Sequence, residues 1–147
     1  MTHKTKLIAG VVFAGMMAAG MARADDKDVI DYREHIMKAL EEQTAAIGMI
    51  VSTQIPPDNV AAHASAIALS AKLALKSFEP KVQGGQAKPE VWTKWDDFSA
   101  RMKKFEVNSQ KLADAANKGA NIGEITEMLI DALPCKDCHD TYRDEKK

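Results

Sequence analysis

The chain has 147 residues, a length typical of one domain. Apolar residues make up 46% of it and charged residues 28%, with a formal net charge of −1, a balance that argues against wholesale disorder. Lysine and arginine are not in excess, so the chain lacks the basic surface that a nucleic-acid partner needs. Two cysteines exclude a scaffold of several disulfides, and an aromatic content of only 5% favours helices over sheets.

The first 24 residues have the pattern of a secretory signal peptide. Two lysines precede an apolar run over 7–21, and Ala22-Arg23-Ala24 supplies the small residues that a signal peptidase reads. The run is shorter than the roughly 20 residues needed to cross a bilayer, so we expect cleavage after Ala24; an uncleaved membrane anchor is the alternative. Cleavage removes three basic residues and no acidic ones, which changes the net charge from −1 to −4. The remaining part, 25–147, is expected to be exported to the periplasm without membrane insertion.

Two helical segments are predicted in the first half of this exported part. Apolar residues recur on one helical face over about 27–52 and again over about 59–78. The first helix ends before Pro56-Pro57, since proline has no N–H to donate and clashes with the preceding turn. Asp58 is the expected N-cap of the second helix. A loop over 79–89 follows, as its prolines and glycines indicate.

The second half of the chain has two further helical segments. The third begins near Pro89, a residue favoured in the first turn, and ends at about residue 118. The fourth opens at Asn121, which with Glu124 has the spacing of a capping box, and continues to about Leu133. Four amphipathic helices joined by mostly short loops predict an all-α fold, an antiparallel up-down-up-down four-helix bundle.

The chemistry lies in a pentapeptide near the C-terminus. Cys135-Lys136-Asp137-Cys138-His139 is the C-x-x-C-H pattern for covalent attachment of a c-type haem. Positions three apart lie on one face of a helical turn, so Cys135 and Cys138 can both form thioethers to the vinyl groups of one porphyrin. His139 then presents an imidazole to the iron from the tethered side. We therefore predict one covalently bound haem c.

Three other interpretations of these cysteines compete. A thioredoxin-type redox motif would need a preceding strand and a βαβ context, which the chain does not have. A disulfide between Cys135 and Cys138 would contribute little, because the loop that it closes is so short. Zinc would need two further ligands, and the spare histidines, His35 and His63, have no paired spacing.

The position of the motif is also informative, since most small single-haem c cytochromes carry it near the N-terminus. Here the chain resembles the class II c-type cytochromes, which comprise the cytochromes c′ and their low-spin relatives of the c-556 type. The resemblance covers essentially the whole exported part. Its most specific segments are Cys135–Arg143, Val29–Lys38 and Pro89-Glu90-Val91-Trp92.

The resemblance implies a role for each matching residue. Cys135 and Cys138 would hold the haem, and His139 would be the proximal iron ligand. Arg143, one turn beyond His139, matches the family's basic residue beside the proximal face. Arg33 matches an arginine that lies near the haem propionates in cytochromes c′; a solvated charge on the first helix is the alternative.

Two features of the helical segments also bear on the haem. Pro134, directly before the first cysteine, is expected to interrupt the fourth helix and to begin a separate C-terminal segment. The aromatic residues of the third helix are interpreted as bundle core, and some of them also as a wall of the haem crevice. They are Trp92, Trp95, Phe98 and Phe105.

The sixth coordination position decides which function the resemblance implies. Cytochromes c′ place a bulky apolar residue of the first helix over the distal face, which leaves five-coordinate iron open to a gas such as nitric oxide. The c-556 type instead uses a methionine sulfur of that helix as second axial ligand. Met37 stands at this position, and we predict that it ligates the iron; ordinary core packing is the alternative. Met49 lies 12 residues further on, about 18 Å along the same helix, and cannot serve the same haem.

We therefore predict a periplasmic monohaem c-type cytochrome with low-spin iron between His139 and Met37. It would carry one electron between redox partner proteins and would have no catalytic residues, so it is not predicted to be an enzyme. One alternative is a five-coordinate cytochrome c′ that binds nitric oxide or carbon monoxide, and another is a haem-free exported helical structural protein. The resemblance also allows a homodimer, because many cytochromes c′ dimerise, but the sequence does not decide the oligomeric state.

Overall fold

The computed structural model describes residues 24–145, so the predicted signal peptide lies outside the described residues except for Ala24. The elements, in chain order, are α1 (Asp26–Val51), η1 (Pro57–Asn59), α2 (Val60–Ala74), η2 (Leu75–Phe78), α3 (Glu90–Thr93), α4 (Trp95–Asn117), α5 (Ile122–Ala132) and α6 (Cys135–Tyr142). Within these bounds, no helix combines the length and the apolar character that crossing a membrane requires.

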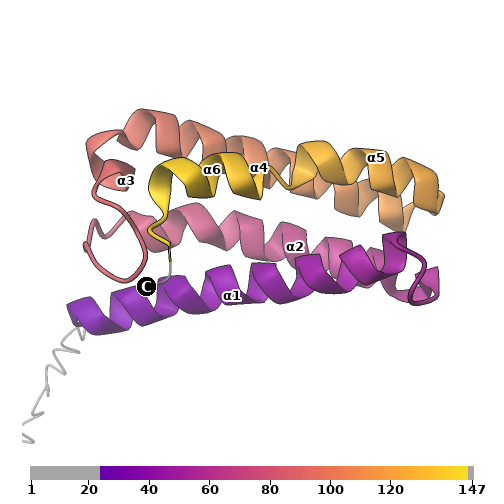
Figure 1. The fold of residues 1–147 in the computed structure, drawn as a ribbon, viewed down its shortest axis with the longest axis horizontal. Helices are drawn as coiled ribbons and strands as arrows, with labels where there is room; N and C mark the ends of the chain where they lie inside the picture. The colour runs from indigo at the N-terminus through magenta and orange to yellow at the C-terminus, as the bar shows by residue number, and fades with distance from the viewer. Residues whose placement is uncertain (1–23, 146–147) are drawn as a thin grey trace, which may run out of the picture.

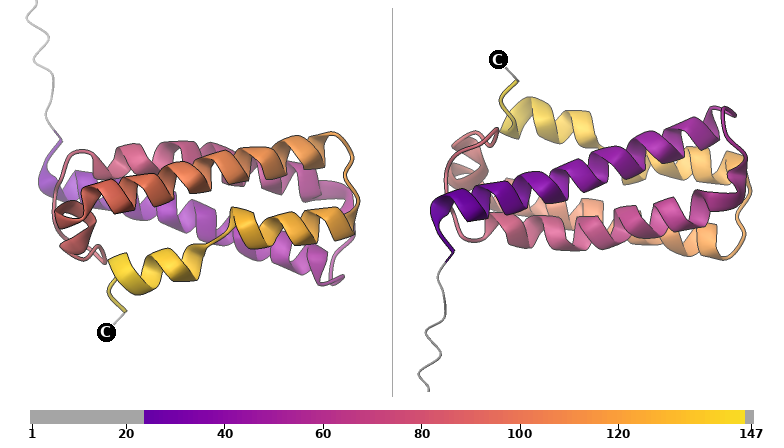
Figure 2. Two further views of the ribbon diagram at one scale, coloured as in Figure 1. Left: turned by 90° about the horizontal axis from the view of Figure 1, so that it is seen from above. Right: turned by 90° about the horizontal axis from the view of Figure 1, so that it is seen from below.

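The long helices form an antiparallel four-helix bundle, as predicted (Figure 1). The successive long helices α1, α2, α4 and α5 run in alternating directions, and α2 packs against both α1 and α4. The fourth position of the bundle is shared by α5 and α6, of which α5 contacts both α4 and α1. Figure 2 shows α6 at the end of the bundle that also holds α3 and the loop before it.

The core is apolar, and each long helix contributes at least one large side chain that is fully buried in it. Ile47 of α1, Ile67 of α2, Leu112 of α4 and Ile125 of α5 are all fully buried. The α2 helix also buries several alanines, whose small side chains allow α1 and α4 to approach it closely. This packing explains why apolar periodicity alone predicts the bundle.

Two predicted helix boundaries are wrong in detail. Asp58 is not the N-cap of α2: it lies in η1, because Pro57 fixes a turn conformation one residue earlier, and Asn59 precedes α2 without a side-chain cap. The predicted third helix is two helices, α3 and α4, which are separated at Lys94, where φ is −117° and ψ is 42°.

The helix that precedes the haem motif begins and ends as predicted. The Asn121 side chain accepts a hydrogen bond from the Glu124 backbone N–H, and the Glu124 carboxylate accepts one from the Asn121 N–H, so the capping box is present. Its last residue is Ala132, and α6 starts directly after Pro134. The C-terminal motif therefore lies on a helix of its own.

The chain beyond α6 pairs with the loop that precedes α3. The Lys88 N–H donates to the Tyr142 carbonyl at 3.0 Å, and the Asp144 N–H donates to the Gln86 carbonyl at 2.8 Å. An isolated antiparallel bridge joins Ala87 to Arg143 between these two bonds. The loop thus fixes the C-terminal end of α6.

Candidate functional site

The two cysteines lie on the first turn and a half of α6. Cys135 is exposed and Cys138 is half-buried, and neither forms a disulfide. Their spacing of three places both thiols on one helical face, as thioether attachment requires. Cys138 packs against the edge of the apolar core, and burial raises the pKa of its thiol while the nearby Arg101 opposes that shift. The pair is therefore free and suitably spaced to tether one porphyrin.

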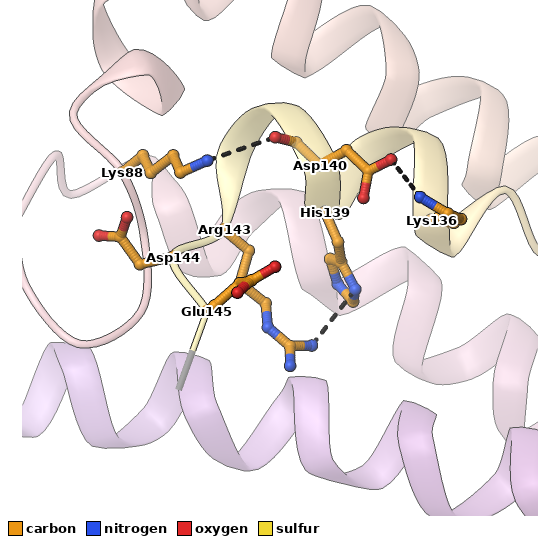
Figure 3. A pocket seen from close by; sticks show the side chains of 7 residues that line it. All are labelled: Lys88, Lys136, His139, Asp140, Arg143, Asp144 and Glu145. Carbon is orange, nitrogen blue, oxygen red and sulfur yellow. Dashed lines mark hydrogen bonds and ion pairs between the residues drawn. The ribbon is translucent and has the colours of Figure 1, made fainter. Parts of the chain in front are cut away.

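His139 follows Cys138 and its ring points toward α1 (Figure 3). The Arg143 Nη1 atom lies 3.3 Å from His139 Nδ1, and Nε2 is the ring nitrogen that a metal could take. With Nε2 bound to a metal, Nδ1 carries the ring proton and no longer accepts from Arg143. Burial, together with the charge of Arg143, lowers the pKa of the imidazole. A neutral imidazole at neutral pH is the form that ligates a metal, so His139 fits the role of an axial ligand.

A cavity of about 610 Å³ opens beside this ring, between α6 and the loop before α3. Its lining is strongly charged, and it is shown in Figure 3: Lys88, Lys136, His139, Asp140, Arg143, Asp144 and Glu145. Of the three donor side chains on α6, only His139 lines this pocket, but the set of two free thiols and one imidazole on a single short helix has the chemistry that a covalently held haem requires. Of the residues that the structure describes, no group of three or more His, Cys, Asp or Glu is arranged to hold a separate metal ion.

A polar network fastens α6 to α4. The Tyr142 hydroxyl donates to the Asp97 carboxylate, and Arg101 Nε donates to the same carboxylate at 2.8 Å. The Arg101 Nη1 atom also reaches the Asp137 carbonyl, between the two cysteines, at 3.4 Å. Tyr142 itself is buried and packs edge-on against Phe98. These contacts hold the haem-attachment helix in one orientation.

The sequence does not predict the contact between Asp97 and Tyr142. The two residues are 45 positions apart, and no local pattern in the sequence connects them. Burial and the hydrogen bond to the Asp97 carboxylate raise the pKa of Tyr142 to about 12, and the same bond lowers the pKa of Asp97.

Arg33 lies on α1 and is only 3% exposed, so the alternative of a solvated charge is wrong. Its Nη1 donates to the Val82 carbonyl at 3.0 Å, and its Nη2 donates to the Gly84 carbonyl at 2.9 Å. The long loop over 79–89 folds back onto α1 and thereby supplies acceptors that make burial of the guanidinium tolerable. A contact between Arg33 and the haem propionates stays a prediction.

Met37 lies one helical turn after Arg33, half-buried, and packs against the edge of the core, as does Cys138. The other residues weighed as ligands have different surroundings. His63 Nδ1 is 2.8 Å from Gln43 Oε1, and Met49 is 44% exposed in the last turns of α1. Ligation of the iron by Met37 stays a prediction.

The aromatic residues of the third predicted helix divide between two elements. Trp92 lies on α3 and donates through Nε1 to the Phe78 carbonyl at 3.1 Å. Phe98 on α4 is buried and packs edge-on against Phe78, while Trp95 and Phe105 pack partly buried against the same core. Their interpretation as bundle core is supported, and a wall of a haem crevice stays a prediction.

Comparison with known proteins agrees with this arrangement. The family model described as Cytochrome C′ matches residues 28–143. A cytochrome c′ of Pararhodospirillum photometricum is 34% identical over 128 residues and covers 82% of this chain and 100% of the relative. A cytochrome c-556 of Agrobacterium fabrum is 28% identical and covers 99% of this chain and 100% of the relative.

Solved structures with the same fold come from Alcaligenes xylosoxidans. A ferrous variant of its cytochrome c′ with bound NO has a TM-score of 0.77 at 26% identity and covers 84% of this chain and 99% of that one. A variant with bound carbon monoxide has a TM-score of 0.76, also at 26% identity, and covers 83% and 98%. With its haem motif on a terminal helix of a four-helix bundle, this chain belongs to the cytochrome c′ family of class II c-type cytochromes, whose members carry one covalent c-type haem.

Proposed function

We propose that this protein is a periplasmic haem protein that binds a diatomic ligand, nitric oxide or carbon monoxide, at an open position on the α1 side of its iron. Cys135 and Cys138 hold the haem, and His139 ligates the iron from α6. The haem supplies an iron that changes its charge by one electron and can accept a ligand at a free axial position. The single observation that carries this proposal is the set of free thiols and imidazole on α6, in a chain similar to proteins solved with NO and with carbon monoxide.

The chain's own residues define the two sides of the iron. On the α6 side, burial of His139 and the positive charge of Arg143 beside it favour the neutral imidazole, the form that ligates a metal. On the α1 side, Met37 is the nearest match to the bulky residue that covers the distal face in cytochromes c′. An apolar thioether at that place would limit access to small ligands and exclude larger ones.

A second candidate function is one-electron transfer with Met37 as the sixth ligand. Two observations favour it: Met37 is half-buried at the core edge, as is Cys138, and one relative, a cytochrome c-556, aligns over 99% of this chain. A methionine sulfur favours the reduced iron, and a filled coordination shell suits rapid electron exchange with redox partner proteins. In neither case does the protein need a substrate of its own, so we propose a carrier or ligand-binding protein and not an enzyme. A homodimer remains part of the proposal.

The deciding experiment is an absorption spectrum of the holoprotein, oxidised and reduced, with and without carbon monoxide. The open site predicts a broad high-spin Soret band and rapid binding of carbon monoxide. A sharp low-spin α-band and no binding of carbon monoxide would instead support the electron carrier. Protein from a host equipped for c-type maturation that is colourless, at the bare polypeptide mass, would contradict both functions.

Met37→Ala sharpens this experiment, with Met49→Ala as the matched control on the same helix. If Met37 only covers the site, its replacement speeds the binding of carbon monoxide and leaves the spin state unchanged. If Met37 is a ligand, its replacement lowers the reduction potential and converts low-spin iron to high-spin iron. Met49 is exposed in the last turns of α1, so its replacement should change neither property.

A further inference from the structure

The buried side chain of Arg33 contacts two aromatic rings and two backbone carbonyls. Its guanidinium carbon lies 5.0 Å from the centroid of the Phe78 ring and 5.3 Å from that of the Trp92 ring, at distances typical of cation–π contacts. Its two terminal nitrogens donate to the carbonyls of Val82 and Gly84. A planar fork that meets two carbonyls and two rings at once is a well-defined anchor for the loop over 82–88.

The same loop is fixed from the opposite side by the end of α6. Backbone bonds join Gln86 to Asp144 and Lys88 to Tyr142, and the Lys88 ammonium donates to the Asp140 carbonyl at 3.3 Å (Figure 3). One short loop therefore connects α1 with the segment that follows His139.

Gly84 shows how closely the loop lies on α1. Its φ is 133°, in a region that side chains rarely adopt, and a Cβ at this position would lie 2.6 Å from Ile30 Cδ1. The carbonyl of this same residue accepts from Arg33. Any other residue would therefore be strained where the loop backbone meets the helix.

We infer that Arg33 is a positioning residue, which acts through the loop over 82–88 to brace α1 against the end of α6 and so sets the opening on the α1 side of the haem iron. The inference rests on the proposed function in that it concerns access to that iron. In this role the guanidinium does not need to touch the haem: it holds the backbone of the loop, and the loop holds α1 and the end of α6 in place.

The loop can affect access to the iron because its two anchor points, on α1 and at the end of α6, both lie next to residues of the iron site. Arg33 and Met37 are four residues apart on α1, so they lie on the same face of the helix. At the other end, Arg143 belongs to the bridge with Ala87 and contacts His139 through its side chain. Movement of the loop would therefore change the position of α1 near Met37 relative to the helix that carries the haem.

The test compares three variants of the holoprotein. Arg33→Lys keeps the positive charge but cannot hold two carbonyls and two rings with one ammonium group. Gly84→Ala leaves Arg33 unchanged, strains the loop backbone at a φ of 133° and places a Cβ against Ile30. Gly119→Ala is the matched control: its φ is 85°, so alanine is strained there too, but nothing lies within 4 Å of the added Cβ.

Two measurements are made on each variant. The first is the association rate of carbon monoxide with the reduced holoprotein, and the second is the hydrogen-exchange protection of the Lys88 and Asp144 amides, which both bond across the brace. We expect Arg33→Lys and Gly84→Ala each to speed association several-fold and to lose protection at both amides. Gly119→Ala should lower thermal stability and leave the rate and the protection unchanged.

Three results would overturn the inference. Unchanged rates and protection in both loop variants would show that no brace exists. An effect of Arg33→Lys without one of Gly84→Ala would mean that the guanidinium acts through a direct contact of its own, for example with a haem carboxylate, and not through the loop. Equal effects in all three variants, Gly119→Ala included, would trace the change to general loss of stability.

Failure of the proposed function gives a different result. If the wild-type holoprotein is low-spin and binds no carbon monoxide, the proposal of an open iron site is wrong. The effect of the brace is then measured as the fraction of low-spin iron in the absorption spectrum. Arg33→Lys and Gly84→Ala should in that case lose part of the low-spin form, and Gly119→Ala should keep it. A low-spin form that is unaltered in all three variants would refute the brace.

Discussion

The two helices that share the fourth position of the bundle, α5 and α6, are held in different ways. The first buries Ile125 and Ala132 completely or nearly so in the apolar core. The second buries only Tyr142 and is otherwise fastened by polar bonds to α4 and to the loop over 82–88. Its thiols and imidazole stay partly accessible as a result.

Along this side of the bundle, α5 therefore serves mainly stability, and α6 carries the residues that can bind a haem. A large buried side chain contributes about 2–5 kcal/mol when compared with alanine, whereas one intramolecular hydrogen bond contributes only about 0.5–1.5 kcal/mol. Of these two helices, α5 therefore contributes more to stability through apolar burial, since α6 buries Tyr142 alone. The α6 half fixes orientation at small cost and leaves room for a bound group.

The largest expected effect is on haem attachment. The double substitution Cys135→Ala, Cys138→Ala removes both sulfurs that can form thioethers, so we expect complete loss of covalent haem, measured as the mass of the purified protein. Lys136→Ala, which changes a residue between the two cysteines, should retain the haem mass. A double variant that still carried covalent haem would contradict the assignment of these thiols.

The next effect is on stability, through α5. Ile125→Ala should lower the free energy of unfolding by about 2–5 kcal/mol, because it leaves a cavity in a fully buried site. Denaturant titration measures the loss. Ile130→Ala is the matched control on the same helix, since Ile130 is 78% exposed, and it should cost little. Equal losses in the two variants would contradict the division of α5 into a buried and an exposed face.

A smaller effect is expected where α6 is tied to α4. Tyr142→Phe removes the hydroxyl that donates to Asp97 and should cost about 1 kcal/mol at neutral pH. The pKa of Tyr142 is about 12 in the folded protein, above its ordinary 10.0, so the folded state holds this proton more tightly than the unfolded state does. The contribution is therefore complete below pH 10 and is lost as the pH rises toward 12.

Unfolding titrations at several pH values between neutrality and 12 test this dependence. The difference in stability between the wild type and Tyr142→Phe should shrink across that window. Tyr32→Phe is the control, because Tyr32 is 52% exposed, and it should show no comparable change. A difference that stayed constant up to pH 12 would exclude a tightly held proton on Tyr142.

The smallest effect is expected on the surface of α6. Lys136 pairs with Asp140 one turn away, but their side chains are 84% and 61% exposed, so solvent and salt screen the pair. Lys136→Ala should change the free energy of unfolding by less than about 1 kcal/mol, as measured by denaturant titration in low and high salt. A larger loss would contradict the screening of this exposed pair by solvent and salt.

The helices, the capping box and the haem motif could be predicted because each depends on residues close together in the sequence. Asn121 and Glu124 are an example: their reciprocal bonds lie within a single turn. The place of Arg33 could not be predicted, since its acceptors lie 49 and 51 residues away in a loop without regular structure. The break at Lys94 is of the same kind, because apolar periodicity continues across it from Trp92 to Phe98.

Pro134, which separates α5 from α6, also affects how the protein unfolds. Because α5 ends at Ala132 and α6 begins at Cys135, each helix has its own ladder of backbone bonds. The terminal helix can therefore melt as a separate cooperative unit while the apolar body remains folded. Thiols near the C-terminus would then become accessible to the attachment machinery at a free-energy cost well below that of unfolding the whole domain.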